Sequence, residues 1–337
     1  MKISSSDRRS LLSLIHRFPR QVVSVLGDLV ADEFIHGEIS RISREAPVLI
    51  LRQERKDIVP GGAGNAANNL VELGAGVQLL GAVGEDESGE ALLRYFQEKG
   101  VSTRWIAKVP NYATPTKSRV LGRLGHGHAQ QIVRIDREPQ EILSRNSRFE
   151  LRQRTLPLLK ESSALLISDY GYGAVDAQEL MHLQKSLRGI YLPVTVDSRY
   201  RILDYRRVTA STPNEPEMEA AFGRRIGDEI DLLHQLAYRF LRTASLRALL
   251  VTRGREGMVL YEPRRKPQIL PIFGSDQVAD VTGAGDTVIA AFTLALAAGA
   301  SFLHAAMLAN CAGGLVVMKS GTATVSRREL EEAIRNA

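Results

Sequence analysis

The sequence predicts an α/β fold in which a mostly parallel β-sheet is covered by helices on both faces. The first observation is a series of short, apolar, β-branched segments whose lengths are typical of buried strands. These expected strands cover residues 22–26, 77–80, 164–168, 192–197, 208–211 and 248–252. The second observation is that helical stretches, such as residues 65–73 and 89–99, lie between several of them. Alternating strands and helices favour parallel strands, because each crossover packs a helix onto the sheet.

The composition agrees with a soluble globular protein. The chain has 337 residues, of which 44% are hydrophobic and 24% charged, and this length suits one large α/β domain. No uncharged apolar run is long enough to cross a membrane; the nearest is residues 288–300. The single cysteine, Cys311, excludes an internal disulfide and fits a reducing cytoplasm.

The formal net charge of +6 does not by itself indicate a nucleic-acid partner. Lysine and arginine are spread over the whole chain, and the densest basic clusters, within residues 199–207 and 264–266, are short. A solvated surface with a few arginines facing an anionic substrate is the favoured interpretation. We therefore expect neither a nucleic-acid partner nor a membrane partner.

The order of elements predicts a short extension, a main domain and a small second sheet. Residues 1–20 do not form a secretory signal, and their apolar residues have the spacing of a short amphipathic helix. Residues 21–337 form the main domain. Two segments, residues 33–59 and 108–137, break the alternation of strand and helix. Strand-like residues 48–51, 117–124 and 129–135, the last two joined by residues 125–128, predict a small β-sheet that acts as a lid.

The segment 280–286, with the sequence DVTGAGD, carries the strongest chemical signal. It precedes a helix that is apolar nearly all round and is therefore expected to be buried. Gly283, Ala284 and Gly285 let the backbone approach a ligand closely, and the first N–H groups of the helix attract an anion. We expect Asp286 to stay ionised at pH 7, because N–H donors and the helix dipole favour its charge. It would accept a hydroxyl proton late in phosphoryl transfer. The alternative is an ordinary glycine-rich loop with Asp286 as a helix cap.

Two groups near the start of the chain suit sugar hydroxyls. Gly61, Gly62 and Asn65 combine an exposed backbone with an amide side chain at the opening of a helix. A close crossing of helix and strand is the alternative explanation for the small residues. Asp28 and Asp32 follow the first strand and suit paired hydroxyls, with a turn residue and a surface charge as the alternative.

Further polar residues lie at the ends of later strands, where parallel sheets bind ligands. Asn214 and Glu217 stand three residues apart at a helix start and suit hydrated Mg²⁺ near phosphates. A plain helix cap is the alternative. Thr252 and Gly254 form a strand end and a turn that suit the border of a nucleotide site. The chain has neither a Walker A run nor a His-Arg-Asp loop.

Taken in order, these features resemble the ribokinase-like (PfkB) carbohydrate kinases over roughly residues 21–330. The resemblance rests on the Gly-Gly…Asn loop, then Asn-x-x-Glu, then Thr-x-Gly, and finally Asp-x-Thr-Gly-Ala-Gly-Asp. It implies a three-layer α/β/α ribokinase-like sandwich with a small β-sheet lid. It also implies transfer of the ATP γ-phosphoryl group to a sugar hydroxyl with Mg²⁺, and hints at a monovalent cation beside the anion hole.

The resemblance implies a role for each matching position. The implied roles are Asp286 as the base; Gly283, Ala284 and Gly285 as the anion hole; Asn214 and Glu217 as residues serving Mg²⁺ through water and the phosphates; Thr252, Gly254 and Asn310 as the border of the nucleotide; and Asp28, Gly61, Gly62 and Asn65 as sugar ligands.

A narrower resemblance points to the heptose 7-phosphate kinase branch of this family. It is carried by residues 27–32, 40–48, 116–120, 134–138 and 168–173, the last group including Asp169. These kinases phosphorylate the C1 hydroxyl of D-glycero-β-D-manno-heptose 7-phosphate, on the route to lipopolysaccharide heptose. A 7-phosphate requires cations. The cations in or beside the expected lid are Arg41, Lys117, Arg119 and Arg134, each with a solvated surface charge as its alternative.

The chain departs from the heptose kinase pattern at three places. Arg44 replaces a proline, and Asp197-Ser198-Arg199 replaces the usual Asp-Pro-Lys. The chain stops at Ala337, whereas the bifunctional members continue into a nucleotidyltransferase domain, so we expect a separate protein to supply that step. A kinase of ribose, fructose or another sugar phosphate is the alternative function, followed by a non-catalytic sugar or nucleotide sensor. Because lid sheets in this family often pair between subunits, we also expect a homodimer.

Overall fold

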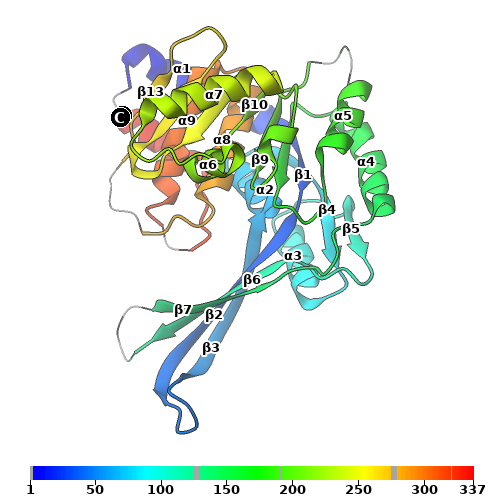
Figure 1. Cartoon of the computed structure of the whole chain (residues 1–337), viewed down its shortest axis with the longest axis vertical. Helices are drawn as coiled ribbons and strands as arrows, with labels where there is room; N and C mark the ends of the chain where they lie inside the picture. Colours follow the sequence, from blue (N-terminus) through cyan, green and yellow to red (C-terminus); the bar gives the residue numbers. More distant parts are fainter. Residues whose placement is uncertain are drawn as a thin grey trace.

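A computed structural model describes residues 3–124, 127, 129–187, 189, 191–274, 279–319 and 321–337. Its larger sheet has the strand order β13-β12-β11-β10-β9-β8-β1-β4-β5 (Figure 1). The strands are β1 (Val22–Gly27), β4 (Gly76–Gly84), β5 (Ile106–Val109), β8 (Ala164–Asp169), β9 (Val194–Ser198), β10 (Ala210–Ser211), β11 (Ala248–Thr252), β12 (Met258–Tyr261) and β13 (Gln268–Leu270). Neighbouring strands from β11 through β10, β9, β8, β1 and β4 to β5 pair in parallel, and β12 and β13 add antiparallel at the β11 edge.

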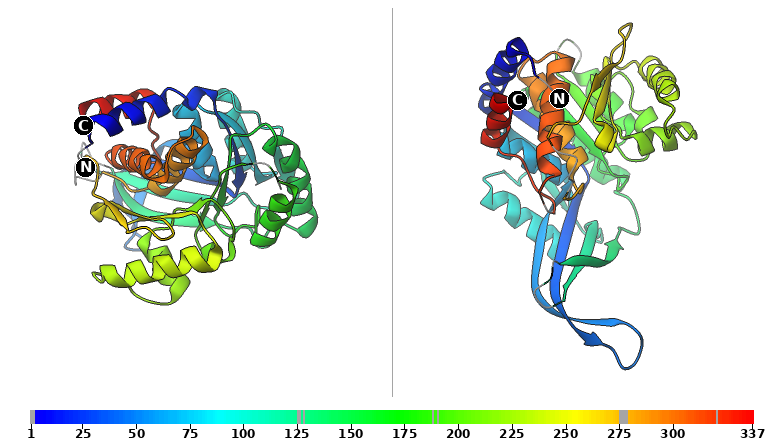
Figure 2. Two further views of the ribbon diagram at one scale, coloured as in Figure 1. Left: turned by 90° about the horizontal axis from the view of Figure 1, so that it is seen from above. Right: turned by 90° about the vertical axis from the view of Figure 1, so that its left-hand side faces the viewer.

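Helices cover both faces of this sheet, which confirms the predicted fold class (Figure 2). The helices are α1 (Ser5–Ile15), α2 (Ala63–Glu72), α3 (Glu87–Glu98), α4 (Arg145–Leu159), α5 (Ala177–Ser186), α6 (Glu215–Phe222), α7 (Ile230–Ala244), α8 (Ala284–Ala297), α9 (Phe302–Val316) and α10 (Arg327–Asn336). One apolar core packs α1, α2, α3, α8, α9 and α10 against the sheet, and a second packs α4 to α7. Within the described residues, no helix has the length and apolar character needed to span a membrane.

The alternation of side chains along the central strands explains why both faces are buried. In β8, Ala164 and Leu166 belong to the first core, whereas Leu165 and Ile167 belong to the second. A strand that is covered on both faces is a continuous apolar run in the sequence, and such runs predicted these strands.

A second sheet, which we call the projecting sheet, extends away from the main body (Figures 1 and 2). Its strands, in spatial order, are β3 (Leu49–Gly62), β2 (Leu29–Ile42), β6 (Thr116–Arg123) and β7 (Gln130–Arg137). Its long strand β2 begins at Leu29, separated from β1 by Asp28 alone, which is earlier than the expected start at residue 33. Lys108 and Val109, which were assigned to the second lid segment, instead pair with β4 in the larger sheet. Of the expected 125–128 connection, Gly125, His126 and His128 lie outside the described residues.

The N-terminal helix α1 packs against the last helices of the chain. Leu11, Leu14 and Ile15 are buried in the first core, and the helix within the expected extension spans Ser5–Ile15. His304 in α9 lies 3.1 Å from the Asp7 carboxylate. The extension is therefore an integral part of the α1–α9–α10 layer.

Helix α8 is the central element of the first core. It is buried along most of its length and packs against α9, α2 and strands β8 and β9. Its apolar sequence leaves little to stabilise it except burial. The helix therefore carries its first turn, and any functional group there, to a fixed place at the carboxyl ends of the strands.

Candidate active site

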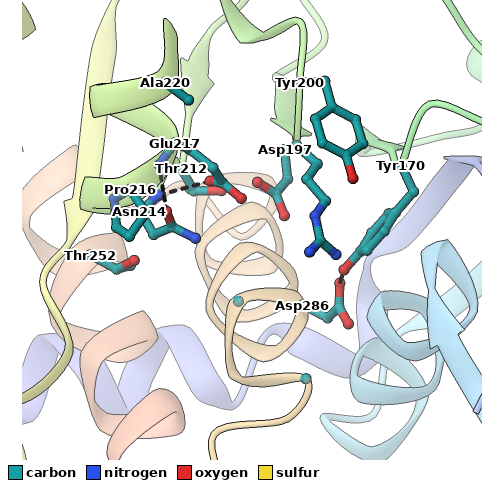
Figure 3. Close-up of a pocket in the computed structure, with 13 residues that line it drawn as sticks. Tyr170, Asp197, Tyr200, Thr212, Asn214, Pro216, Glu217, Ala220, Thr252 and Asp286 are labelled. Atoms are coloured by element: carbon teal, nitrogen blue, oxygen red, sulfur yellow. Dashed lines mark hydrogen bonds between the residues drawn. The ribbon is translucent and has the colours of Figure 1, made fainter. Parts of the chain in front are cut away.

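A cavity of about 410 Å³ lies where the first turn of α8 faces the carboxyl ends of β8, β9, β10 and β11 (Figure 3). Parallel sheets bind ligands at this edge. The lining residues are Tyr170, Asp197, Arg199, Tyr200, Thr212, Asn214, Pro216, Glu217, Ala220, Thr252, Gly283, Gly285 and Asp286. The cavity therefore combines carboxylates, an arginine and the start of a buried helix.

The start of α8 presents unpaired N–H groups to this cavity. Gly283 caps the helix with φ = 76°, and a side chain there would meet the Asn65 amide nitrogen at 2.4 Å. The backbone N–H groups of Gly285 and Asp286 have no acceptor within the described part of the chain. A side chain at Gly285 would meet no atom within 4 Å, so its backbone is open to a ligand. This geometry suits an anion, as the sequence predicts for residues 283–285.

Asp286 lies in the first turn of α8 and is 3% exposed. Its carboxylate accepts hydrogen bonds from Asn65 Nδ2 at 2.9 Å and from the Tyr170 hydroxyl at 3.1 Å. Burial raises the pKa of Asp286 to about 7, although the hydrogen bonds from Asn65 and Tyr170 oppose the rise. The expectation that Asp286 is fully ionised at pH 7 is therefore wrong. Loss of hydration outweighs the helix dipole and the donors, so a substantial fraction is protonated at neutral pH.

Asn65 contacts Asp286 instead of standing open to a ligand. Its amide nitrogen donates to Asp286 and, at 3.4 Å, to the carbonyl of Gly283. Its amide oxygen accepts from Asn69 Nδ2 at 3.1 Å, and Asn69 in turn accepts from the Thr287 hydroxyl at 3.0 Å. This network joins α2 to α8 and is completely buried. In this structure Asn65 orients Asp286, and its predicted sugar contact stays a prediction.

The glycine pair before α2 is explained by close packing. A side chain at Gly61 would meet Asp32 Oδ2 at 2.5 Å, and one at Gly62 would meet the Asp28 carbonyl at 2.8 Å. Gly62 also has φ = 56°, which favours glycine. The two glycines thus let β3 end against the strand that carries Asp32.

Two acidic residues that were predicted to bind substrate have structural roles. The Asp28 carboxylate accepts backbone N–H groups of Tyr170, Tyr172 and Ala174 at 2.8–3.0 Å, which fixes the loop after β8. Asp169 accepts from the Ser198 and Tyr205 hydroxyls, from the Arg201 guanidinium and from the Gly171 N–H. Both carboxylates are 1–2% exposed. Their oxygens are occupied by the protein, so the predicted substrate contacts of Asp28 and Asp169 are corrected.

The remaining predicted substrate residues gather on the projecting sheet. Asp32 forms an ion pair with Arg119 at 2.6 Å and accepts from the Thr322 hydroxyl at 3.4 Å. Arg134 is paired with Asp136 on β7.

Lys117 makes no hydrogen bond or ion pair to any described residue; its ammonium lies 5.1 Å from the centre of the Tyr170 ring. Burial lowers the pKa of Lys117, and its charge acts on Asp286. It is thus a desolvated cation beside the candidate base.

Asn214 and Glu217 form a capping box at the start of α6. Asn214 Oδ1 accepts from the Glu217 N–H at 2.8 Å, and a Glu217 oxygen accepts from the Asn214 N–H at 2.9 Å. The capping alternative is therefore confirmed, yet both residues also line the cavity. Asp197 lies nearby on β9 (Figure 3). Burial raises the pKa values of both Asp197 and Glu217, and for Asp197 the neighbouring negative charges add to the rise. Two carboxylates in this setting favour a bound cation.

The donor set suits hydrated Mg²⁺ better than a metal held by protein ligands alone. The described residues contain no cluster of three or more histidine, cysteine or acidic side chains that could hold a metal. Asp197, Glu217 and the Asn214 amide supply only a few oxygens, and Mg²⁺ usually keeps several waters and binds substrate phosphates. The side-chain oxygen of Thr212 is buried at the same cavity without a hydrogen-bond partner among the described residues.

A second cavity of about 360 Å³ adjoins the first and shares Asn214, Thr252 and Gly285 with it. The predicted nucleotide residues Thr252, Gly254 and Asn310 all line it, together with apolar side chains that include Met258 and Val288. Asn310 donates to the Pro271 carbonyl at 2.8 Å. The two cavities meet at the first turn of α8, so a ligand in the second can reach Asp286 through the first.

The sequence interpretation did not assign Tyr170, Asp197, Arg199 or Thr212 to the site. Asp197 follows a predicted strand directly, and its position was the available signal. Tyr170 belongs to segment 168–173, which carries the narrower resemblance, but no role followed for it from the sequence. Thr212 gave no signal, because its importance depends on which helix start lies opposite it.

Comparison with known proteins gives a family assignment. Residues 23–329 match the profile described as pfkB family carbohydrate kinase. The bifunctional protein HldE of Geobacter metallireducens is 42% identical over 329 residues, which cover 96% of this chain and 65% of that protein. HldE of Trichlorobacter lovleyi is 39% identical, with coverage of 97% and 66%. The chain thus spans slightly less than two thirds of the length of these relatives.

Solved structures share the fold at low sequence identity. Arabidopsis thaliana ribokinase, complexed with ribose and ATP, gives a TM-score of 0.71 at 20% identity, with 94% of this chain and 98% of that chain covered. Escherichia coli phosphofructokinase-2 in complex with potassium gives 0.73 at 19% identity, with the same coverage. These likenesses confirm the ribokinase-like fold.

The buried charge of Asp286 predicts a pH-dependent gain in stability for Asp286→Asn. The folded-state pKa of about 7 lies above the ordinary 3.8, so wild-type stability falls as pH rises from about 4 to about 7. The Asp286→Asn variant has no carboxyl group at this position to ionise, so its free energy of unfolding does not fall for this reason. We expect its advantage in free energy of unfolding to be about 2–3 kcal/mol larger at pH 8 than at pH 5. Urea unfolding of both proteins at both pH values measures this, and the contribution of other groups cancels in the difference. An advantage independent of pH would contradict the buried-charge assignment.

Proposed function

The chain belongs to the pfkB family of carbohydrate kinases, and we propose that it transfers the γ-phosphoryl group of ATP to the C1 hydroxyl of D-glycero-β-D-manno-heptose 7-phosphate. The proposal rests on one observation above all. The carboxylate of Asp286 lies beside the free N–H groups at the start of α8, in a cavity that adjoins a second, nucleotide-sized cavity.

This arrangement supplies the two requirements of phosphoryl transfer. The N–H groups of Gly285 and Asp286 are oriented toward a region where negative charge develops, and they need no reorganisation during the reaction. Asp286 is within reach of a hydroxyl in the same cavity and accepts its proton as the O–P bond forms. A pKa of about 7 leaves enough carboxylate at neutral pH and keeps the group basic enough for this transfer.

The nucleotide would occupy the second cavity, with its phosphates directed toward α8. Thr252, Gly254 and Asn310 border that cavity, and Val288 contributes an apolar wall. Bound Mg²⁺ would neutralise phosphate charge, held through water by Asn214 and Glu217 and by Asp197. The capping box keeps the Asn214 and Glu217 side chains in place before any ligand arrives.

A phosphorylated sugar is favoured by the charges on the projecting sheet, which we propose acts as the lid. Arg119 and Arg134 already have carboxylate partners, but Lys117 has none among the described residues. A desolvated ammonium without a counter-ion binds an anion strongly, because little hydration is lost when the anion arrives. Asp32, beside Lys117 in the sheet register, is suited to hydroxyls of the same sugar.

The heptose assignment is supported by the relatives and by local sequence. The relatives described above are bifunctional HldE proteins, and this chain aligns with about two thirds of their length. Segments 40–48, 116–120 and 168–173 resemble the heptose 7-phosphate kinase branch, and the last contains Tyr170, which contacts Asp286.

A panel of sugars assayed by ADP release tests the substrate. We expect turnover with the heptose 7-phosphate and little with unphosphorylated heptose, ribose or fructose. Lys117→Ala should raise KM for the heptose phosphate about 10-fold or more, because a charged hydrogen bond contributes about 1.5–3 kcal/mol. Lys266→Ala, which removes an exposed lysine, is the control and should leave KM unchanged. Efficient turnover of a neutral sugar alone would refute the heptose phosphate assignment.

The rate should depend on pH through Asp286. We expect kcat/KM to rise with pH and to level off above about 7, because only the carboxylate accepts the proton. Asn65→Ala removes a hydrogen bond that stabilises the charged form, so the midpoint should move upward by about 1 pH unit or more. Asp286→Asn should abolish most turnover while ATP still binds, as measured by calorimetry. A midpoint that is the same in wild type and Asn65→Ala would argue against Asp286 as the titrating group.

We also propose that the projecting sheet mediates a homodimer. Strand β7 is an exposed edge, and Ile42, Leu49, Val133 and Ile135 of the sheet are 45–65% exposed. Light scattering at micromolar concentration should give twice the monomer mass. Ile135→Lys should shift the mass toward the monomer, whereas Met181→Lys, at an exposed position on α5, should not. A wild-type monomer would rule the dimer out.

A further inference from the structure

The loop after β9 carries an arginine that the predicted site does not use. Arg199 lines the cavity that contains Asp286, Asn214 and Glu217. Its guanidinium makes no hydrogen bond or ion pair to any described residue. The guanidinium carbon lies 5.7 Å from the centre of the Tyr200 ring. An arginine that lines a cavity rich in carboxylates and yet forms no fixed ion pair has its donors free for a ligand.

Neighbouring arginines are already paired. Arg201 binds Asp169 at 3.1 Å, and Arg253 binds Glu215 at 3.1 Å. These ion pairs hold the strand ends together and fix the two guanidinium groups on protein carboxylates. Arg199 thus differs from them in its surroundings rather than in its residue type.

The backbone that carries Arg199 is anchored on both sides. The Arg199 N–H donates to the Asp169 carbonyl at 3.0 Å, and the preceding Ser198 hydroxyl donates to Asp169 at 2.9 Å. The Ser198 oxygen also accepts from the Arg201 N–H at 3.2 Å. A fixed backbone with a free side chain suits a group that must reach one place in the cavity at little entropic cost.

The charge of Arg199 acts on both sides of the reaction centre. It opposes the rise in the pKa values of Asp197 and Glu217, and it lowers the pKa of Lys117. Arg199 lines the same cavity as Asp197, Glu217 and Asp286, so its charge is available on the acidic side and near the candidate base. The α8 N–H groups border the same cavity through Gly285.

We propose that Arg199 is a catalytic residue whose guanidinium binds the oxygens of the phosphoryl group during its transfer. In that step the sugar oxygen forms a bond to the γ-phosphorus, and the bond from this phosphorus to the β–γ bridging oxygen breaks. The electron pair leaves with ADP, and the hydroxyl proton passes to Asp286. The equatorial oxygens carry charge throughout, and a planar guanidinium binds two of them at once. The inference rests on the proposed phosphoryl-transfer site but is independent of which sugar is used.

Steady-state kinetics of Arg199→Ala with any sugar that the wild type phosphorylates tests the role. We expect kcat to fall about 10²–10³-fold, as for other preorganised donors, while KM for the sugar changes less than about threefold. Arg199→Lys should retain intermediate activity, and added guanidinium should partly restore Arg199→Ala. Arg206→Ala, which removes an exposed positive charge a few residues away, is the matched control and should behave as wild type. Unchanged kcat, or a change confined to KM, would overturn the proposal.

A binding measurement separates this proposal from the identity of the substrate. Mg·ADP with aluminium fluoride mimics the transferring group and needs no known sugar. Wild type should bind Mg·ADP more tightly when aluminium fluoride is present, and Arg199→Ala should lose most of that gain while binding Mg·ADP alone normally. Equal gains in both proteins would overturn the proposal even if the heptose assignment holds. Thermal melting should differ by only a small amount, because Arg199 has no side-chain hydrogen bond or ion pair within the described chain to lose and contributes through its charge and the Tyr200 ring alone.

Discussion

The burial of one carboxylate, that of Asp286, constrains the rest of the site. Raising its pKa from 3.8 to about 7 corresponds to a cost on the order of 4 kcal/mol when the group is ionised. The apolar packing of α8 offsets this cost and fixes the first turn of the helix. Asn65 and Tyr170 then hold the carboxylate from two sides, one from α2 and one from the loop after β8. A base held in this way reacts without first having to be oriented.

A second layer of buried acids keeps the surrounding loops in place. Asp28 accepts hydrogen bonds from three backbone N–H groups of the loop that carries Tyr170. Asp169 accepts hydrogen bonds from the Ser198 hydroxyl at the end of β9 and from the Arg199 N–H directly after it. Neither acid faces the cavity, yet each controls the position of a side chain that does. Satisfied buried charges of this kind define a unique geometry because leaving any of their partners unpaired would be costly.

The positive charges divide between structural and available groups. Arg119, Arg134, Arg201 and Arg253 are committed to carboxylates, whereas Lys117 and Arg199 have no such partner among the described residues. Lys117 belongs to the projecting sheet and Arg199 to the main body. A sugar phosphate bound at Lys117 and a phosphoryl group bound at Arg199 would bring the two parts together, which would couple binding to closure of the sheet and to exclusion of water.

The sequence by itself determined the fold class and the centre of the site. Continuous apolar runs specify strands buried on both faces, and an apolar helix preceded by small residues specifies a buried helix start, because these signals depend only on neighbouring residues. Tertiary structure decided which polar groups are free. Asp28, Asp169 and Asn65 look like ligands in the sequence but are occupied by backbone and side-chain partners distant along the chain. The ionisation of Asp286 was likewise decided by burial. Local sequence indicates which donors a carboxylate can have, but how much water it loses depends on the packing of segments that lie more than a hundred residues away.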